Sequence, residues 1–338
     1  MALIDTEGFG LSTTASDYVT YGLFYSGFNS IGTNGPLGDN YAVLNQGQAA
    51  YKQLASAYTT FFYGARVNNN NASPVDLVFN DVNSVNQIAI TLNNSGNGSL
   101  SAYRNGTLLG SSSAGVVPLD SWYYVEVGAV IASGTDGSVS VRINGVQALN
   151  LTGINTAGGG NNNVQRYGIS HLQDDDLFPY TTHWYFCDNT GSAPWNTFLG
   201  DTRIQTIEPV SNASVAFTPE GKASNYENAA LVPPVPGTDY NSDSTVDAQD
   251  TFNMGTVSAS LSTVFGVKQV VLAAKSDSGS RSLETILQSG TTTANGTSTA
   301  LGTSPAVQVT MYETDPNTGA QWTLAAVDAV KAGYNVSG

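Results

Sequence analysis

Residues 103–110 read YRNGTLLG, residues 118–127 read PLDSWYYVEV and residues 137–147 read GSVSVRINGVQ. The first and the third of these segments each contain an Asn-Gly pair. Asn-Gly tolerates the positive φ angles of a type I′ turn, whose twist matches the two strands that it joins. The segments therefore predict two β-hairpins with a Trp-led strand between them.

Apolar residues alternate with other residues along these predicted strands. Every second residue from Tyr123 is apolar, and Val139, Val141 and Ile143 alternate with polar residues further on. Side chains of a strand point to its two faces in turn, so one face of each strand is expected to be buried. The opposite face of the first strand carries Trp122, Tyr124 and Glu126.

The order of these segments resembles the laminin-G-like, concanavalin-A-type jelly roll. The shared features are an Asn-Gly hairpin, a Leu/Asp-x-Trp-Tyr strand, a Gly-x-Val-x-Val-x-Ile-Asn-Gly-Val hairpin and a Thr-Gly-x-x-Thr segment. The resemblance covers roughly the first two thirds of the chain. It implies an all-β protein with an N-terminal two-sheet jelly-roll sandwich that presents ligands or partners on one face or rim. Such a fold does not define an activity by itself.

The length and the proline distribution predict a second domain. A chain of 338 residues is long for one sandwich, so we expect a jelly roll at 1–207 and a smaller C-terminal β domain at 246–338. Several prolines between them predict a linker or assembly arm at 208–245. Apolar residues at helical spacing, followed by a glycine, predict one terminal helix at about 322–333.

The composition limits the partners of the chain. It contains 11 Lys and Arg against 26 Asp and Glu, a formal net charge of −15. Phosphate contacts need basic side chains, so nucleic acid and anionic membranes are not expected partners. The single cysteine, Cys187, excludes an intrachain disulfide. The first residues lack the basic and apolar regions of a signal peptide, and no segment has membrane-spanning length.

Blocks in both halves of the chain point to a more specific resemblance. The chain opens with MALIDTEGF, and WNTFLGDTRI follows at 195–204, FTPEGKASNYEN at 217–228 and YETDPNTGAQWT at 312–323. This ordered set resembles virion proteins of tailed bacteriophages that carry a laminin-G-like domain, such as tail-fibre, baseplate and minor structural proteins.

That resemblance implies a virion structural protein that is made in the host cytoplasm and forms homo-oligomers. We expect a tail component, a fibre, baseplate or adaptor protein, that binds other virion proteins or a host-surface glycan without covalent chemistry. A capsid decoration or head-fibre protein is the alternative within this class. A free carbohydrate-binding lectin is the alternative outside it.

The catalytic patterns that we considered do not favour an enzyme. Glycosidases on this kind of sandwich work with two carboxylates on one strand, in a Glu-x-Asp-x-Glu pattern, and no Glu of this chain has such a partner. His171 and His183 are the only histidines, and no Gly-x-Ser-x-Gly or His-Glu-x-x-His motif accompanies them. The sequence therefore predicts that the chain is not an enzyme.

Two sets of residues are candidates for ligand sites. Aromatic rings stack on sugar faces, which nominates Trp122, Tyr124, Trp184 and Trp195 for carbohydrate or partner binding, with core packing as the alternative. Carboxylate oxygens suit Ca²⁺, and no other cofactor is expected. A calcium site would use Asp174, Asp175, Asp176 and Asp188, with a solvated acidic loop as the alternative.

Overall fold

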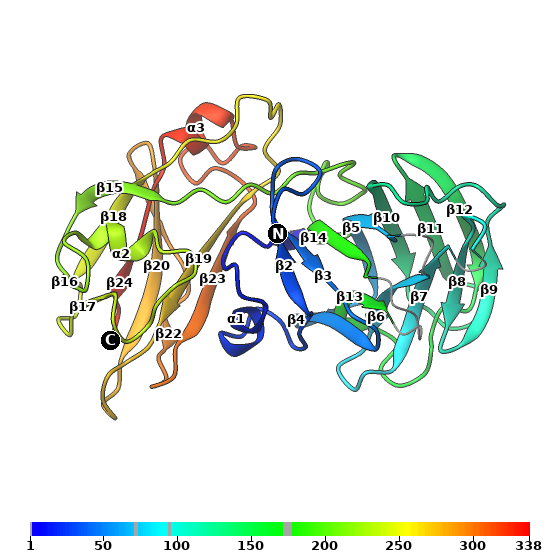
Figure 1. Cartoon of the computed structure of the whole chain (residues 1–338), viewed down its shortest axis with the longest axis horizontal. Helices are drawn as coiled ribbons and strands as arrows, with labels where there is room; N and C mark the ends of the chain where they lie inside the picture. The colour runs from blue at the N-terminus through cyan, green and yellow to red at the C-terminus, as the bar shows by residue number, and fades with distance from the viewer. Residues whose placement is uncertain (1, 71–73, 94–95, 172–177) are drawn as a thin grey trace. The chain divides into compact units, whose positions relative to one another are not determined.

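The computed structural model describes residues 2–70, 74–93, 96–171 and 178–338. The chain divides into two compact units. Unit 1 comprises Met1–Val19 and Leu23–Ile204, and unit 2 comprises Thr20–Gly22 and Gln205–Gly338. Both units consist mainly of antiparallel strands (Figure 1).

Unit 1 is a sandwich of two antiparallel sheets, which confirms the predicted all-β, two-sheet architecture. The large sheet has the strand order β12-β11-β10-β5-β14-β3-β2, with β1 paired to β14. Its strands are β1 (Leu3–Glu7), β2 (Ser30–Gly32), β3 (Tyr41–Val43), β5 (Thr60–Asn68), β10 (Tyr123–Val130), β11 (Gly137–Ile143), β12 (Val146–Ile154) and β14 (Tyr180–Asp188). A short helix, α1 (Ala15–Thr20), lies between β1 and β2 in the chain.

The small sheet of unit 1 has the strand order β4-β13-β6-β7-β8-β9. Its strands are β4 (Gln48–Tyr58), β6 (Val75–Asn80), β7 (Asn86–Leu92), β8 (Leu100–Arg104), β9 (Thr107–Ser111) and β13 (Val164–His171). Aromatic rings fill the space between the two sheets. Phe61 of β5 lies 4.5 Å from Phe79 of β6, measured between ring centroids, and 5.4 Å from Phe186 of β14.

The two predicted hairpins are present. Asn105 and Gly106 join β8 to β9 with φ angles of 42° and 78°, and Asn144 and Gly145 join β11 to β12 with 49° and 78°. All four φ angles are positive, as a type I′ turn requires. The predicted burial of one strand face is also confirmed, since β11 alternates buried and half-buried residues along its whole length.

A buried group of charges joins the two sheets. Lys52 of β4 is 4% exposed, and its Nζ lies 2.7 Å from Asp5 Oδ2 and 3.1 Å from Glu7 Oε2, both on β1. Tyr167 of β13 donates its hydroxyl to Asp5 Oδ2 at 2.9 Å. Burial alone would lower the pKa of Lys52, but the carboxylates of Asp5 and Glu7 outweigh it and raise the pKa. Lys52 is therefore a cation inside the sandwich.

Unit 2 is built around a sheet with the order β15-β18-β24-β20-β21, in which β22 also pairs with β20. Two pairs of strands, β16-β17 and β19-β23, form small sheets of their own. The strands are β15 (Pro209–Ser214), β16 (Thr218–Glu220), β17 (Tyr240–Ser242), β18 (Gln249–Met254), β19 (Val267–Ala273), β20 (Ser282–Ser289), β21 (Thr292–Asn295), β22 (Thr299–Ala300), β23 (Ala306–Tyr312) and β24 (Lys331–Val336).

The segment 208–245 differs from the linker or arm that its prolines predict. It contributes β15, β16, β17 and the helix α2 (Asn225–Ala229) to unit 2. Pro209 and Pro219 lie in edge strands, where the missing N–H of proline breaks no internal ladder. Asp250 of β18, which is fully buried, accepts hydrogen bonds from the backbone N–H groups of Ala216 and Phe217 at 2.8 and 3.0 Å.

The predicted C-terminal helix exists but is shorter than expected. Helix α3 spans Leu324–Asp328 and begins at Thr323, whose Oγ1 accepts a hydrogen bond from Ala326 N at 3.1 Å. Residues 331–336, predicted to be partly helical, instead form β24 between β18 and β20. A Cβ at Gly333 would lie 1.9 Å from the Asp250 carbonyl oxygen, so glycine permits this close pairing. Among the described residues no helix is long and apolar enough to cross a membrane.

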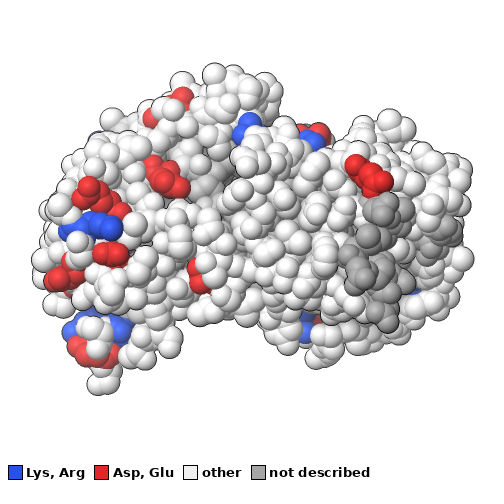
Figure 2. All heavy atoms as spheres, in the orientation of Figure 1, with Lys and Arg blue, Asp and Glu red and all other residues white. Residues whose placement is uncertain are grey.

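Charged side chains are sparse on the surface. Most of the face drawn in Figure 2 belongs to residues other than Lys, Arg, Asp and Glu. Charged residues make up only 11% of the chain. A charged side chain without a counter-charge therefore has few other charged groups near it that would mask its electrostatic field.

The Lys52→Met substitution should destabilise unit 1 by about 3–5 kcal/mol, because it leaves the buried carboxylate of Glu7 and the half-buried carboxylate of Asp5 without their cation. Urea unfolding followed by tryptophan fluorescence measures this change. The control is Lys222→Met, which alters an exposed lysine and should change the free energy of unfolding by about 0.5 kcal/mol or less. Adding Asp5→Asn and Glu7→Gln to Lys52→Met should restore part of the loss. A loss below about 1 kcal/mol for Lys52→Met would show that the buried charges are not coupled.

Candidate functional site

The outer face of the small sheet carries rows of polar side chains. Arg166 of β13 pairs with Gln53 of β4 on one side and with Asn80 of β6 on the other. Two residues further along β13, Gly168 pairs with Tyr51 of β4. Side chains two residues apart share a face. The core residues of β13 and β4 alternate with this set, so these polar groups point away from the sandwich interior.

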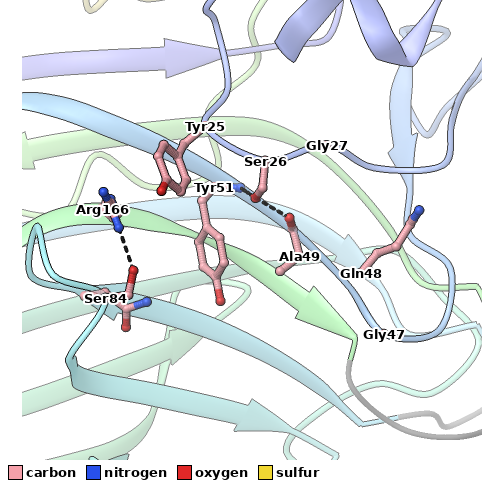
Figure 3. A pocket seen from close by; sticks show the side chains of 10 residues that line it. Tyr25, Ser26, Gly27, Gly47, Gln48, Ala49, Tyr51, Ser84 and Arg166 are labelled. Carbon is pink, nitrogen blue, oxygen red and sulfur yellow. Dashed lines mark hydrogen bonds between the residues drawn. The ribbon is translucent and has the colours of Figure 1, made fainter.

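A cleft of about 550 Å³ lies on this face. Its walls come from residues 25–27, from residues 47–49 and Tyr51 at the start of β4, and from Asn80, Ser84 and Arg166. Figure 3 shows Arg166 and Ser84 toward one end, Gln48 and Gly47 toward the other, and Tyr51 between them. All these residues belong to unit 1.

Residues 25–27 are held against β4 by hydrogen bonds. Tyr25 N donates to Tyr51 O at 2.7 Å, Tyr51 N donates to Ser26 Oγ at 3.2 Å, and Ser26 Oγ donates to Ala49 O at 2.5 Å. The segment thus pairs with the edge strand β4. The side chain of Tyr25 is nevertheless 57% exposed. Hydrogen bonds therefore fix the backbone of this segment, while the ring of Tyr25 is exposed and can contact a ligand.

Arg166 is held by neutral groups. Its Nε donates to Gln53 Oε1 at 3.0 Å and its Nη1 donates to Ser84 Oγ at 2.5 Å. Its guanidinium carbon lies 4.0 Å from the centroid of the Tyr25 ring, within the range of a cation–π interaction. These contacts orient the guanidinium group without neutralising its charge.

The Tyr51 hydroxyl is a hydrogen-bond donor at neutral pH. Burial raises the pKa of Tyr51 and the negative charge of Asp76 raises it further, although hydrogen bonds with Ser170 and Asn80 act in the other direction. Asp76 lies opposite Ser170 in the next row of the face. Burial also raises the pKa of Asp76, while the Thr91 hydroxyl, which donates to Asp76 Oδ1 at 2.6 Å, opposes this shift.

Gly168 allows β4 and β13 to approach each other beneath the cleft. A Cβ at this position would lie 1.9 Å from the Ala50 carbonyl oxygen. No side chain can occupy that space without moving β4, which carries Tyr51 and Gln53. The floor of the cleft therefore depends on a glycine.

The predicted binding residues Tyr124, Trp184 and Trp195 are not on an open surface, so their assignment as exposed stacking residues is wrong. Trp184 is 0% exposed and packs in the core, with its ring centroid 5.6 Å from that of Phe9. Tyr124 and Trp195 are 1% and 6% exposed. Core packing, the default expectation for each of these residues, holds for Trp184.

Tyr124 is buried because residues 195–204, here called the covering segment, lie over the outer face of the large sheet. The Tyr124 hydroxyl lies 2.6 Å from Thr202 Oγ1. Glu126, on the same face of β10, accepts hydrogen bonds from Gly200 N at 2.8 Å and from the Tyr185 hydroxyl at 2.6 Å. This face is therefore already occupied by the chain itself.

Trp122, the fourth predicted binding residue, is half-buried. Its ring centroid lies 5.6 Å from that of Tyr41 and 6.1 Å from that of Tyr180. These three rings form a small aromatic cluster on strands of the large sheet and do not line the cleft. The structure therefore does not bring the four predicted aromatic residues together into one site.

The predicted calcium site rests on residues that the structure only partly describes. Asp174, Asp175 and Asp176 lie outside the described residues, so their role stays a prediction. Asp188 Oδ1 accepts hydrogen bonds from Thr190 N at 2.8 Å and Thr190 Oγ1 at 2.7 Å, which closes a turn. In the described ranges no group of three or more His, Cys, Asp or Glu side chains is arranged to hold a metal ion.

The residues of the cleft could not be recognised in the sequence, because β4 lacks the usual pattern of a strand. Ala50 and Leu54 of this strand face the core, but Lys52 lies between them at an inward position. A lysine there interrupts the apolar alternation that identifies a strand. The sequence around Lys52 does alternate, with Ala50 and Leu54 on either side of it. This alternation identifies a strand only if Lys52 is an inward residue, which requires knowing that it pairs with Asp5 and Glu7.

The comparisons with known proteins concern the fold. No protein-family model matches the sequence, and neither does any curated protein. Similar solved structures include the PL-14 alginate lyase from Aplysia kurodai, with 12% identity and a TM-score of 0.40 over 55% of this chain and 99% of that chain. A complex of the alginate lyase Aly36B with alginate trisaccharide has 14% identity and a TM-score of 0.36 over 55% and 98%. The carbohydrate-binding module CBM66 from Bacillus subtilis has 9% identity and a TM-score of 0.32 over 44% and 86%.

These neighbours contradict the prediction that the chain is not an enzyme, since several of them are polysaccharide lyases. The patterns sought in the sequence were those of glycosidases, serine hydrolases and zinc proteases, and they do not test for a lyase. The likeness concerns the sandwich alone at this level of identity. No reaction is assigned to this chain from its neighbours.

Asp39 fastens the end of the covering segment. Its Oδ2 lies 3.0 Å from Arg203 Nε and 3.4 Å from His183 Nε2, and His183 Nδ1 accepts a hydrogen bond from Ile204 N at 3.2 Å. Burial alone would raise the pKa of Asp39, but the neighbouring His183 and Arg203 outweigh it and lower the pKa. A carboxyl group whose pKa is lower in the folded chain stabilises the fold at pH values above its pKa in the unfolded chain. This stabilisation is lost as the pH falls through the pKa of the group in the folded chain.

The Asp39→Asn substitution should therefore reduce the free energy of unfolding of unit 1 at pH 7 by about 1–2 kcal/mol. The difference from the wild-type chain should hold above about pH 5 and narrow as the pH falls below about 3.9. Urea unfolding at a series of pH values measures it. Asp247→Asn is the control, because Asp247 is exposed and lies in unit 2. A difference that stayed constant down to pH 3 would contradict this account.

Proposed function

We propose that the chain is a structural component of a tailed-bacteriophage particle that binds carbohydrate through the cleft on the small sheet. The observation that carries the binding part is the combination of an exposed tyrosine ring with fixed hydrogen-bonding groups in one concave site. Tyr25 supplies the exposed ring, and Tyr51, Asn80 and Gln48 supply polar groups beside it.

This combination suits a saccharide. A pyranose ring presents an apolar face that stacks on an aromatic ring, and its hydroxyl groups need donors and acceptors at its edge. The Tyr51 hydroxyl donates, and the side-chain amides of Asn80 and Gln48 both donate and accept. On the large sheet, the covering segment occupies the side that Tyr124 and Glu126 share.

The assignment to a phage particle rests on the sequence blocks at 195–204, 217–228 and 312–323. Within that class we propose a tail component, a fibre, baseplate or adaptor protein, present in several copies that associate with each other and with other virion proteins. Presentation of a glycan-binding cleft suits host attachment. Capsid decoration and a free lectin are the competing assignments.

The Tyr25→Ala substitution should weaken saccharide binding by up to about tenfold, since it removes one aromatic stacking contact. The full chain is applied to a glycan array, and the best ligand is then titrated by calorimetry. Tyr240→Ala is the matched control, because Tyr240 is a 43% exposed tyrosine in unit 2. The recovered saccharide is also examined for cleavage, which would assign a reaction to the same cleft. Failure to bind any saccharide would overturn the binding proposal.

The particle assignment predicts that the chain is present in purified virions. Quantitative mass spectrometry of gradient-purified particles tests this, with a known capsid protein as the internal standard. A low copy number relative to that standard supports a tail position, whereas a high copy number supports capsid decoration. Absence from the particle would leave the free lectin as the better assignment.

A further inference from the structure

We infer that the cleft selects an anionic saccharide, and that Arg166 binds the acid group. The inference rests on the proposed function, because it names the ligand class of the same cleft. The shared chemistry is a negatively charged oxygen group on a sugar, either the carboxylate of a uronic acid or a sulfate ester.

The charge of Arg166 is not neutralised within the described part of the chain. Its partners there are the neutral side chains of Gln53, Ser84 and Tyr25. Three other cations of unit 1 pair with carboxylates: Lys52 with Asp5 and Glu7, and Arg66 and Arg203 with aspartates. Arg104 and Arg142 contact neutral groups as Arg166 does, but neither of them lines the cleft. In a chain with more than two acidic residues for each basic one, an arginine without a carboxylate partner in a cleft is notable.

Arg166 also has hydrogen-bonding capacity to spare. A guanidinium group has five N–H donors. Gln53 and Ser84 take two of them, so three remain, and these have no acceptor among the described residues. The fork of an arginine matches the two oxygens of a carboxylate or sulfate, with which it forms charge-assisted hydrogen bonds.

The guanidinium group is oriented before a ligand arrives. Gln53 and Ser84 hold two of its nitrogen atoms, and the Tyr25 ring lies against it at 4.0 Å. Orientation in advance reduces the conformational entropy lost on binding. Tyr25 thus packs against the cation, and its exposed part lines the cleft where a sugar ring would bind.

The position of Asp76 sets the direction of the ligand. Arg166 belongs to the row of Gln53 and Asn80, whereas Asp76 pairs with Ser170, two rows away on the same face. An acid group is attracted to the first row and repelled by the second. The charged end of the saccharide therefore lies at Arg166, and its neutral part extends over Tyr51.

Calorimetric titration of the full chain with three saccharides tests this inference. The saccharides are a uronic acid oligosaccharide, the methyl ester of the same oligosaccharide and a sulfated oligosaccharide. The methyl ester keeps the sugar rings and loses the negative charge. The acid form should bind about tenfold or more tightly than the ester. Arg166→Gln should remove this preference, so that the acid form and the ester bind this variant with equal affinity. Arg166→Lys should give an intermediate affinity, because it keeps the charge and loses the fork. Preference between the acid and the sulfated saccharide identifies the source of the negative charge.

The control variant is Lys222→Gln, which removes one exposed positive charge from unit 2 and should leave all affinities unchanged. Asp76→Asn should strengthen binding of the acid form, because it removes a neighbouring negative charge. Equal binding of the acid and the ester, or equal losses in Arg166→Gln and Lys222→Gln, would overturn the inference and leave the carbohydrate-binding proposal intact. Binding of none of the saccharides would overturn both.

Discussion

The ion group of Lys52, Asp5 and Glu7 is the constraint on which the candidate site depends. A buried cation is costly unless carboxylates compensate it, and here both carboxylates come from β1 of the opposite sheet. A slip of β4 by one residue would turn Lys52 out of the sandwich and bring its neighbours in. The pairing of Lys52 therefore fixes which side chains of β4 point outward. Those side chains are Tyr51 and Gln53, one of which lines the cleft while the other holds Arg166.

The two outer faces of the sandwich differ because the covering segment lies over the large sheet. On the large sheet, Gly64 leaves room for the rings of Tyr185 and Tyr124, and the hydroxyl groups of these tyrosines then bond to the covering segment. Glu126 beneath that segment accepts hydrogen bonds from Tyr185 and from the backbone, so its carboxylate is satisfied inside the protein. On the small sheet, the described residues that flank the polar row of Arg166 are the edge segment at 25–27 and Ser84. This difference in covering is why we propose the small sheet, rather than the large one, as the ligand-binding face.

The sequence allowed prediction of features that are specified locally. The Asn-Gly hairpins and the alternation along β11 follow from turn chemistry and strand geometry, so both could be recognised without tertiary information. The role of Trp184 could not, since a tryptophan on a strand is equally suited to a core and to a surface until its neighbours are known. The end of α3 was missed because β24 pairs with two other strands, and this pairing overrides helical spacing. The Arg166 site joins residues separated by more than a hundred positions, from Tyr25 to Arg166, and no local pattern connects them.

The acidity of the whole chain and the cationic character of the cleft are compatible because charge acts over short distances in salt. At physiological ionic strength the Debye length is about 8 Å, so most of the excess carboxylates are screened from a ligand at Arg166. Residue 170, which pairs with Asp76, lies four residues along β13 from Arg166, a separation of roughly 13 Å at the usual rise per residue. Salt therefore weakens the repulsion between Asp76 and an acid group at Arg166 without abolishing it. A lower salt concentration lengthens the Debye length, so the anionic ligand is attracted more strongly by Arg166. The same change makes the excess carboxylates of the chain repel the ligand more strongly, and the two effects oppose each other. The affinity for an anionic saccharide should therefore change less with salt concentration than it would in a cationic protein that binds the same group through one arginine.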